Sequence, residues 1–414
     1  MELNVSENLN EKQELAVKHT EGPLLIIAGP GSGKTRVITQ RIAHLIEHCD
    51  VKPWQIVAMT FTNKAAREMK DRLETLFSGE EQHRINASTF HSFCAMLLRR
   101  EADFLNLNQD YSILDDTDQI SLLKRVIDEV GIDPNQWKVR SIQSAISNAK
   151  SKLMTASVFR AGKNSYFEEI VDRVFTRYEE LVSQSNAVDF DDLIMNTNIL
   201  FQNHPEVLEK YQSRYLHVMV DEFQDTNLAQ YQIARQLAGL HKNLCVVGDP
   251  DQSIYSWRNA DITNILSFKK DYPGATEISL EQNYRSTKTI LAAAQKVISP
   301  NQNRVDKDLW TQNDEGSPII IAEAYDEFEE ARITLNEIQN LIDTGICKPD
   351  EIAIMFRVNA QSRVLEEACL KSGVSYQLIG GIRFYQRQEV KDIVSYLRLL
   401  NNFNDDASLA RISN

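Results

Sequence analysis

One stretch constrains the fold of this chain more than any other. It runs from Leu24 to Thr35 and reads LLIIAGPGSGKT. Its apolar part, Leu24 to Ala28, is short enough for a buried strand, and the glycines that follow end that strand. Glycine permits backbone conformations that turn successive N–H groups inward, and such a loop forms a concave site for anions. The loop residues expected to cradle phosphate groups are Gly29, Gly31, Ser32 and Gly33.

Two side chains at the end of this loop add the chemistry of a nucleotide site. Lys34 can reach the outer phosphates of a nucleotide, and the Thr35 hydroxyl can hold a magnesium ion. Residues Arg36 to Ile46 are predicted to form a helix whose N-terminus faces the same phosphates. The pattern is Gly-x4-Gly-Lys-Ser/Thr, with Ala28 at its first position. A glycine-rich turn without a ligand is the alternative, but the strand–loop–helix context favours a nucleoside triphosphate.

Length, charge and cysteine content limit the class of protein. The 414 residues, of which 42% are hydrophobic, can bury a large core and indicate two to four domains. The net charge of −14 limits non-specific binding to polyanions, yet it is compatible with a local basic or aromatic track. No apolar run approaches the roughly 20 residues of a membrane span. Five scattered cysteines favour a reducing, cytoplasmic setting.

Polar and aromatic residues follow two further predicted strands, Gln55 to Thr60 and Ile85 to Ser88. Phe61 and Thr62 come directly after the first strand, and His91 follows the second, at the strand ends where open α/β sheets bind ligands. Basic residues then recur at helical spacing, which a solvated helix face also explains: Lys64, Arg67 and Lys70.

Gln13 lies a short distance before the phosphate loop. Its amide can offer both a donor and an acceptor to an adenine edge, which would select ATP over GTP. An exposed helix start is an equally good interpretation of this segment.

An acidic pair stands at the end of another predicted strand, Leu216 to Val220. Hydrolysis of a nucleotide needs one carboxylate to hold Mg²⁺ and another to orient the attacking water. We assign Asp221 to the metal and Glu222 to the water. The next predicted strand, Asn243 to Val247, ends in GDPDQSIYSWRNAD, where Gln252 is placed to sense a γ-phosphate.

Three residues in the same segment suit unstacked nucleobases. Tyr255 and Trp257 supply a stacking surface, and Arg258 supplies a cation. Core packing of the two aromatic residues is the alternative, but the strand-end position and the polar neighbours favour nucleic acid.

The residues between the predicted strands Ile85 to Ser88 and Leu216 to Val220, from about Arg99 to His204, are predicted to be helical and acidic. The stretch NAVDFDDLI within them suggests either a metal site or a helix N-cap, and the N-cap is favoured for Asp189, Asp191 and Asp192. A second candidate metal site comprises His44, His48 and Cys49. It is disfavoured because no third, well-spaced ligand accompanies them.

Taken in order, the motifs AGPGSGKT, TFTNKAAREMKDR, TFHSF, VDEFQDTN, GDPDQSIYSWRNAD and QNYRS resemble those of superfamily 1 DNA helicases of the UvrD, Rep and PcrA type. The resemblance extends to GGIRFYQRQEVKDIVSYLRLL near the end of the chain. It implies an α/β fold: a RecA-like P-loop NTPase with a parallel sheet and a helical insertion, followed by part of a second RecA-like domain.

The resemblance also implies roles for individual residues, with ATP and Mg²⁺ as cofactors. Gln13 would read adenine, Tyr284 would stack on it, and Arg36 would line the nucleotide pocket. Catalysis would rest on Lys34, Asp221, Glu222, Gln252 and Arg285, and the metal would be held by Thr35 and Asp221. Single-stranded DNA would follow a track lined by Phe61, Thr62, Asn63, His91, Phe190, Tyr255, Trp257 and Arg258.

The family layout implies a first motor domain of residues 1–97 and 205–280, a helical insertion at 98–204, and part of a second motor domain at 281–400. Residues 401–414 would begin a second insertion. The segments PIIIAEAY and EIAIMFR would be buried strands of the second motor domain. Two further family motifs, one resembling T-x-H-x-x-K-G-L-E and one with a catalytic arginine, do not occur after Arg285, so we expect a fragment.

The function expected from the resemblance is ATP-driven 3′-to-5′ movement on single-stranded DNA and unwinding at duplex junctions, in DNA repair or replication, with repair or replication proteins as partners. The alternative is a module that binds nucleotide, DNA or a partner protein without turnover.

Overall fold

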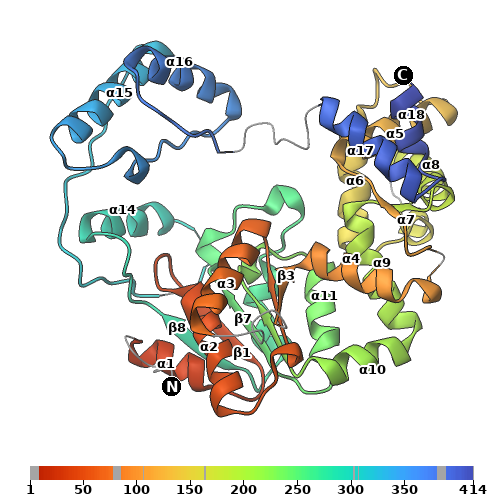
Figure 1. The fold of residues 1–414 in the computed structure, drawn as a ribbon, viewed down its shortest axis with the longest axis horizontal. Helices are drawn as coiled ribbons and strands as arrows, with labels where there is room; N and C mark the ends of the chain where they lie inside the picture. Colours follow the sequence, from red (N-terminus) through yellow and green to blue (C-terminus); the bar gives the residue numbers. More distant parts are fainter. Residues whose placement is uncertain are drawn as a thin grey trace. The chain divides into compact units, whose positions relative to one another are not determined.

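The computed structural model describes residues 9–77, 85–105, 107–162, 165–301, 304–305, 307–379 and 388–413. The chain divides into two compact units (Figure 1). The first comprises Met1–Gly316 and Val394–Asn414, and the second comprises Ser317–Ile393. Residues 380–387, which include most of the GGIRFYQRQ part of the last quoted motif, lie outside the described residues.

A six-stranded sheet forms the centre of the first unit, with strand order β3-β2-β6-β7-β1-β8. All of its strand pairs are parallel, and Leu24 on β1 pairs with Cys245 on one side and Thr276 on the other. The parallel α/β fold is therefore confirmed. The strands are β1 (Leu24–Ala28), β2 (Ile56–Thr60), β3 (Asn86–Thr89), β6 (His217–Val220), β7 (Leu244–Gly248) and β8 (Thr276–Leu280).

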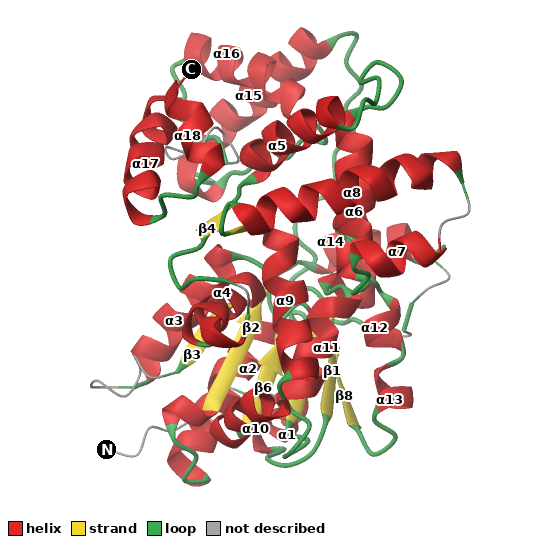
Figure 2. Cartoon of the chain, turned by 90° about the vertical axis from the view of Figure 1, so that its right-hand side faces the viewer, coloured by secondary structure: helices red, strands yellow, loops and turns green. Residues whose placement is uncertain are grey.

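Helices cover both faces of this sheet, which explains why its strands are continuous apolar runs (Figure 2). Successive strand residues point to opposite faces, so β1 sends Leu24 and Ile26 into one core cluster and Leu25 and Ile27 into the other. The first cluster is completed by α1 (Glu11–Lys18), α2 (Lys34–His48) and α3 (Asn63–Leu76). The second is completed by α4 (Phe90–Arg100), α9 (Phe190–Asn203), α10 (Pro205–Arg214) and α11 (Leu228–Leu237).

The segment between β3 and β6 is mostly helical, as predicted, and builds a third core cluster around residues such as Val126, Ile146 and Phe175. A two-stranded parallel sheet, which the sequence analysis did not anticipate, lies at its base. Besides α9 and α10, its elements are β4 (Ser112–Ile113), α5 (Asp116–Glu129), α6 (Val139–Ser151), α7 (Ala156–Gly162), α8 (Tyr166–Gln184) and β5 (Ala187–Val188).

A buried ionic cluster joins α6 to the start of α9. Lys150 Nζ donates to Asp189 Oδ2 at 2.8 Å and to Asp192 Oδ1 at 2.5 Å, and Tyr178 Oη donates to Asp189 at 2.9 Å. Burial opposes ionisation of Asp189, but the charge and hydrogen bonds of Lys150 outweigh it and lower the pKa of Asp189. Asp189 also caps α9 by accepting from the backbone N–H of Asp192, so the predicted N-cap is confirmed.

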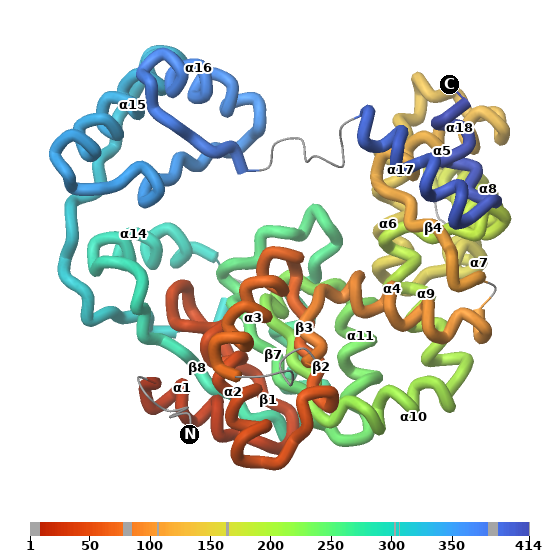
Figure 3. Tube along the Cα trace, viewed as in Figure 1, coloured from red at the N-terminus to blue at the C-terminus, as the bar shows by residue number. Residues whose placement is uncertain are grey.

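Residues 394–413 pack on this helical segment (Figure 3). They lie on α17 (Gln388–Asn401) and α18 (Asp406–Ser413). Asn402 Nδ2 donates to the carbonyl oxygens of Ser185 and Asn186, both at 3.1 Å, and Ser112 Oγ donates to Asp405 Oδ2 at 2.6 Å. These buried polar contacts tie 394–413 to the first unit.

Residues 281–316 also belong to the first compact unit. The reason is that Gln282 bridges to Trp310 next to β8, while the Asn283 N–H donates to the Trp310 carbonyl at 2.8 Å. The loop between these paired residues contains α14 (Lys288–Ile298), and the pairing holds both ends of this loop at the edge of the sheet. The two short helices before β8 are α12 (Thr263–Leu266) and α13 (Phe268–Asp271).

The second unit contains α15 (Glu327–Asp343) and α16 (Ser362–Ser372), which pack on each other. The prediction of buried strands at PIIIAEAY and EIAIMFR is wrong: both segments are irregular, with Ile321 93% and Met355 92% exposed. A parallel strand is buried only where strands flank it and helices cover both faces. The described part of this unit has α15, α16 and the start of α17 (Gln388–Asn401), and it has no strand.

No helix among the described residues combines the length and the apolar character that a membrane span requires.

The buried cluster around Lys150 makes a testable contribution to stability. Lys150→Met would leave Asp189 and Asp192 buried without their cation, and loss of one partner of a buried pair costs about 3–5 kcal/mol. We expect the free energy of unfolding of the helical segment to fall by about 3 kcal/mol, measured by urea denaturation with Trp137 fluorescence as the probe.

The matched control is Lys152→Met, because Lys152 is exposed at the end of the same helix. It should change stability by less than about 0.5 kcal/mol. Equal effects of the two substitutions would show that the cluster has no special energetic role.

Candidate nucleotide site and nucleic-acid interface

The loop between β1 and α2 has the shape of an anion cradle. Gly31 and Gly33 have φ values of 64° and 86°, the left-handed region that glycine adopts at little cost. Ser32 Oγ donates to the Gly29 carbonyl at 2.7 Å and closes the turn. Helix α2 begins at Lys34, two residues earlier than predicted, and no side chain caps its N-terminus. The first turn of α2 can therefore offer backbone N–H groups to an anion.

Glycine is also required here because other residues approach the loop closely. A Cβ on Gly31 would lie 2.7 Å from Cβ of Arg285 and 2.8 Å from Nδ2 of Asn283. That Nδ2 donates to the Pro30 carbonyl at 2.7 Å, and the Tyr284 N–H donates to the Gly31 carbonyl at 2.9 Å. The QNYRS motif is thus fastened directly onto the phosphate loop.

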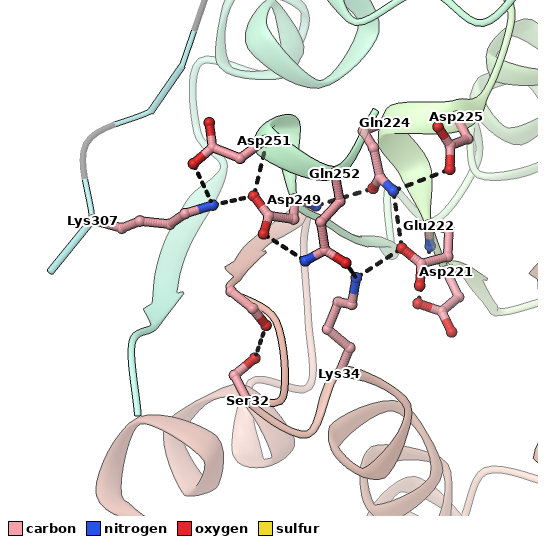
Figure 4. A network of polar contacts seen from close by, with 11 residues as sticks. Ser32, Lys34, Asp221, Glu222, Gln224, Asp225, Asp249, Asp251, Gln252 and Lys307 are labelled. Carbon is pink, nitrogen blue, oxygen red and sulfur yellow. Dashed lines mark hydrogen bonds and ion pairs between the residues drawn. The ribbon is translucent and has the colours of Figure 1, made fainter. Parts of the chain in front are cut away.

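The side chains at the strand ends form one polar network (Figure 4). Lys34 Nζ donates to Glu222 Oε2 at 2.8 Å and lies 3.5 Å from Gln252 Oε1. Gln224 Nε2 donates to the same Glu222 oxygen at 2.9 Å. Glu222 has φ 51°, an unusual value for a residue other than glycine and a strain typical of functional sites. The network joins the phosphate loop to β6 and β7.

Asp221 is buried beside this network. Burial and the adjacent charge of Glu222 raise its pKa to about 7, and the charge of Lys34 opposes the shift. Burial and the Glu222 charge also raise the pKa of Asp225 to about 6. Carboxyl groups that ionise with difficulty at this position would gain from a nearby cation.

Gln13 is buried, so the exposed interpretation of this residue is wrong. Its Nε2 donates to the Ser32 carbonyl at 2.8 Å, and its Oε1 accepts from the Asn10 N–H at 3.0 Å. Each amide atom keeps the capacity for one more hydrogen bond. Asn10 Nδ2 in turn donates to Tyr284 Oη at 2.8 Å, which places the two predicted adenine contacts, Gln13 and Tyr284, around one side chain.

A cavity of about 280 Å³ opens at the phosphate loop and gathers most of the predicted nucleotide residues. Arg36 is exposed on α2 and is absent from its lining. The lining also includes Arg72, which the sequence analysis missed although this residue ends the motif TFTNKAAREMKDR. The lining residues are Gly31, Ser32, Gly33, Lys34, Thr35, Arg72, Glu222, Gln252, Tyr284 and Arg285.

A second cavity, of about 490 Å³, lies between the sheet and the helical segment. It brings together five of the predicted DNA-binding residues from four separate parts of the sequence: Phe61, His91, Phe190, Trp257 and Arg258. Thr62, Asn63 and Tyr255 do not line it. Thr62 instead caps α3 by accepting from the Ala65 N–H at 3.1 Å.

Aromatic contacts shape this second cavity. The Arg258 guanidinium lies 4.6 Å from the centre of the Trp257 ring, and Tyr255 packs against Phe61 with ring centres 4.6 Å apart. Trp257 is 70% exposed, so core packing is the wrong interpretation for this residue. His91 contacts Phe190 edge to face, and burial together with the Arg258 charge lowers the pKa of His91 to about 4. The cavity presents rings and a neutral imidazole, which suit bases more than phosphates.

The described residues contain no group of three or more His, Cys, Asp or Glu side chains arranged to hold a metal ion. Asp189 and Asp192 are instead engaged by Lys150. His44 and His48 stack on each other with ring centres 4.9 Å apart.

Comparison with known proteins gives consistent matches. Residues 9–273 match the UvrD/REP helicase N-terminal domain, and residues 278–414 match the UvrD-like helicase C-terminal domain. The chain is 52% identical over 406 residues to the ATP-dependent DNA helicase PcrA of Bacillus subtilis, covering 98% of this chain and 55% of that protein. Identity to PcrA of Staphylococcus aureus is 51% over 407 residues, covering 98% and 56%. The chain therefore spans about half the length of these curated relatives.

The raised pKa of Asp221 predicts how stability depends on pH. The ordinary pKa of an aspartate is 3.8 and that of Asp221 is about 7, so the folded protein binds an extra proton between these values. Stability is therefore lost as pH rises through this window. Asp221→Asn removes the titrating group and should stabilise the protein at pH 8 by on the order of 1 kcal/mol or more, with little effect at pH 4.

Urea denaturation of both proteins at the two pH values measures this difference. Asp128→Asn is the control, because Asp128 is exposed and should show no such dependence on pH. A stability difference between Asp221→Asn and the unsubstituted protein that is the same at pH 4 and pH 8 would contradict the burial argument.

Proposed function

The chain belongs to the UvrD/REP helicase family, and from this premise we propose that it hydrolyses ATP and uses the energy to move 3′ to 5′ along single-stranded DNA. One observation carries the proposal. The phosphate-loop cavity and the aromatic cavity lie on the same unit, and the loop after β7 contributes Gln252 to the first cavity and Trp257 to the second. We propose residues 1–97 and 205–280 as the first motor domain, 98–204 as its insertion and 281–400 as part of a second.

The triphosphate would bind at the start of α2. Loop N–H groups and the helix dipole favour the negative charge there, and Lys34 supplies a full positive charge. Because Lys34 pairs with Glu222 in this structure, an incoming γ-phosphate would compete with Glu222 for the same ammonium group. Binding would thereby release the Glu222 carboxylate to accept a proton from the attacking water.

Thr35 and Asp221 would hold Mg²⁺, and the buried carboxyl of Asp221, with its raised pKa, fits such a cation. Few protein ligands are needed because Mg²⁺ is commonly held by one or two side chains together with phosphates and water. When bound, the ion neutralises charge on the phosphates. Arg285 and Arg72 line the same cavity and would stabilise the charge that develops during transfer of the γ-phosphate.

The base of the nucleotide would lie beside Tyr284, which is 48% exposed and can stack on it. Gln13 would use its remaining donor and acceptor on the adenine edge. Arg36 is exposed near the same helix start and would line the nucleotide site from outside the cavity.

Single-stranded DNA would enter the aromatic cavity and stack its bases on Trp257 and Phe190. Tyr255 does not line the cavity, but it would hold Phe61 and Arg258 in place by packing against both. Thr62 and Asn63, exposed at the end of β2, would contact the strand beyond the cavity. Because Gln252 and Trp257 belong to one short loop, a movement caused by the γ-phosphate would reach the DNA directly.

We also propose a cytoplasmic role in DNA repair or replication, at duplex junctions and together with repair or replication proteins. This part rests on the similarity to the UvrD/REP helicase family.

The first test is ATP turnover with and without single-stranded DNA. We expect stimulation by DNA, and we expect Lys34→Ala to reduce the stimulated rate about a hundredfold or more, because one preorganised charge contact to the transition state is lost. Lys124→Ala, at an exposed lysine of α5, is the control and should leave the rate unchanged. Nucleotide binding without stimulated turnover would favour the alternative of a binding module.

The second test concerns the aromatic cavity. Trp257→Ala should weaken binding of single-stranded DNA about 5- to 150-fold, since one base–aromatic stack is worth about 1–3 kcal/mol. Fluorescence anisotropy with a labelled oligonucleotide measures the affinity. Trp54→Ala removes a tryptophan outside this cavity and should bind normally. Unchanged affinity of Trp257→Ala would refute the stacking surface.

A further inference from the structure

We propose that Lys307 is a positioning residue for the ATP site: by holding Asp249 it fixes the side-chain amide of Gln252 with its oxygen toward Lys34. This inference rests on the proposed function, because it assigns Lys307 a part in the same reaction. Lys307 belongs to none of the motifs on which the functional assignment depends, and it lies 55 residues beyond Gln252 in the chain.

Lys307 is an unusual lysine because its side chain is 2% exposed. Its Nζ forms an ion pair with Asp249 Oδ1 and lies 3.1 Å from Asp251 Oδ2 (Figure 4). Arg304 lies 3.6 Å from the same Asp251 oxygen. Two cations and two carboxylates therefore meet at the end of β7, and Lys307 is the cation that contacts both carboxylates.

Asp249 links this cluster to the catalytic network. One of its oxygens takes the ion pair with Lys307, and the other accepts from Gln252 Nε2 at 2.6 Å. Its backbone N–H donates to Gln224 Oε1 at 3.0 Å, and Gln224 donates onward to Glu222. The side chain of Asp249 is fully buried, so these contacts are shielded from water.

The charge on Asp249 decides which way the Gln252 amide faces. An ionised carboxylate only accepts hydrogen bonds, so Gln252 must present Nε2 to Asp249 and turn Oε1 toward Lys34. The hydrogen-bond network assigns the two amide atoms here. With this orientation Gln252 offers the nucleotide site an acceptor, which suits a water molecule or an ammonium group such as that of Lys34.

The chain that follows Lys307 is held at the edge of the sheet. Trp310 N–H donates to the Glu281 carbonyl at 3.1 Å, and the Asn283 N–H donates to the Trp310 carbonyl. Leu309 packs so closely on the phosphate loop that a Cβ on Gly29 would lie 2.3 Å from it. A shift of this segment would therefore act on the phosphate loop through Leu309 and on Gln252 through Lys307.

Removal of the Lys307 charge should release the amide of Gln252. In Lys307→Met, Asp249 and Asp251 would lie buried together, and among the described residues Arg304 is the remaining cation paired with Asp251, so one of the two carboxylates must bind a proton or move. A protonated Asp249 can donate to Gln252 Oε1, which would turn the amide over. Lys307→Arg keeps the charge and should preserve the orientation.

The direct test is NMR of the Gln252 side-chain amide in the full chain, labelled with ¹⁵N at glutamine and assigned with Gln252→Ala. The charge-assisted bond to Asp249 should separate the two Nε2 proton shifts from those of exposed glutamines. We expect this signature to disappear in Lys307→Met and to persist in Lys307→Arg. Lys296→Met, at an exposed lysine of α14, should leave it unchanged.

Asp249→Asn provides a second route if Lys307→Met does not fold, because it removes the acceptor charge with almost no change in volume. The same change of the Gln252 signal is expected. An unchanged Gln252 signal in a folded Lys307→Met or Asp249→Asn variant would overturn the inference.

The rate of ATP turnover gives an independent test of the same inference. Lys307→Met should lower kcat about tenfold or more while the Kd for a fluorescent ATP analogue changes less than about threefold, because misplacement of a catalytic group costs rate more than binding. An equal loss of both would indicate a merely structural role and contradict the inference. If the unsubstituted chain shows no turnover stimulated by DNA, the proposed function fails, and the NMR result still decides the role of Lys307.

Discussion

The structure depends on the burial of a parallel sheet on both of its faces. A strand such as β1 contributes alternate side chains to two separate cores, so it must be apolar throughout. Polar chemistry is then restricted to the strand ends, and in a parallel sheet the carboxyl ends of all strands lie along one edge. This is why the phosphate loop, the Asp221–Glu222 pair and the loop after β7 meet although they are far apart in sequence.

Charged side chains gather at this edge of the sheet, and their charges are compensated because lysines pair with carboxylates. Lys34 faces Glu222, and Lys307 faces Asp249 and Asp251. Gln224 and Gln252 connect the two ion pairs because each amide has a donor and an acceptor. The result is one continuous network from the phosphate loop to the chain beyond β8. Binding of a charged ligand at one end would disturb the balance of the whole network.

The aromatic cavity depends on a second constraint, the attachment of the helical segment. Phe190 is the first residue of α9, and Asp189 before it is held by Lys150 in a buried cluster. The ring of Phe190 is thereby fixed opposite residues that follow the strand ends, among them His91 at the start of α4 and Trp257 in the loop after β7. The aromatic cavity thus arises between two parts of one unit, with helices on one side and strand ends on the other.

Local sequence patterns predict the phosphate loop, the acidic pair and the strands β1, β2, β3, β6 and β7, because each is a short run that its own residues define. The edge strand β8 is not predicted from the sequence. Only the tertiary structure decided the burial of Gln13, the arrival of Arg72 at the nucleotide cavity and the contact of Lys307 with Asp249, because their partners lie far away in sequence. The same limit explains why PIIIAEAY and EIAIMFR were wrongly predicted as buried strands. Apolar composition favours a strand, but burial requires flanking strands and covering helices, and a single segment carries no information about whether they are present.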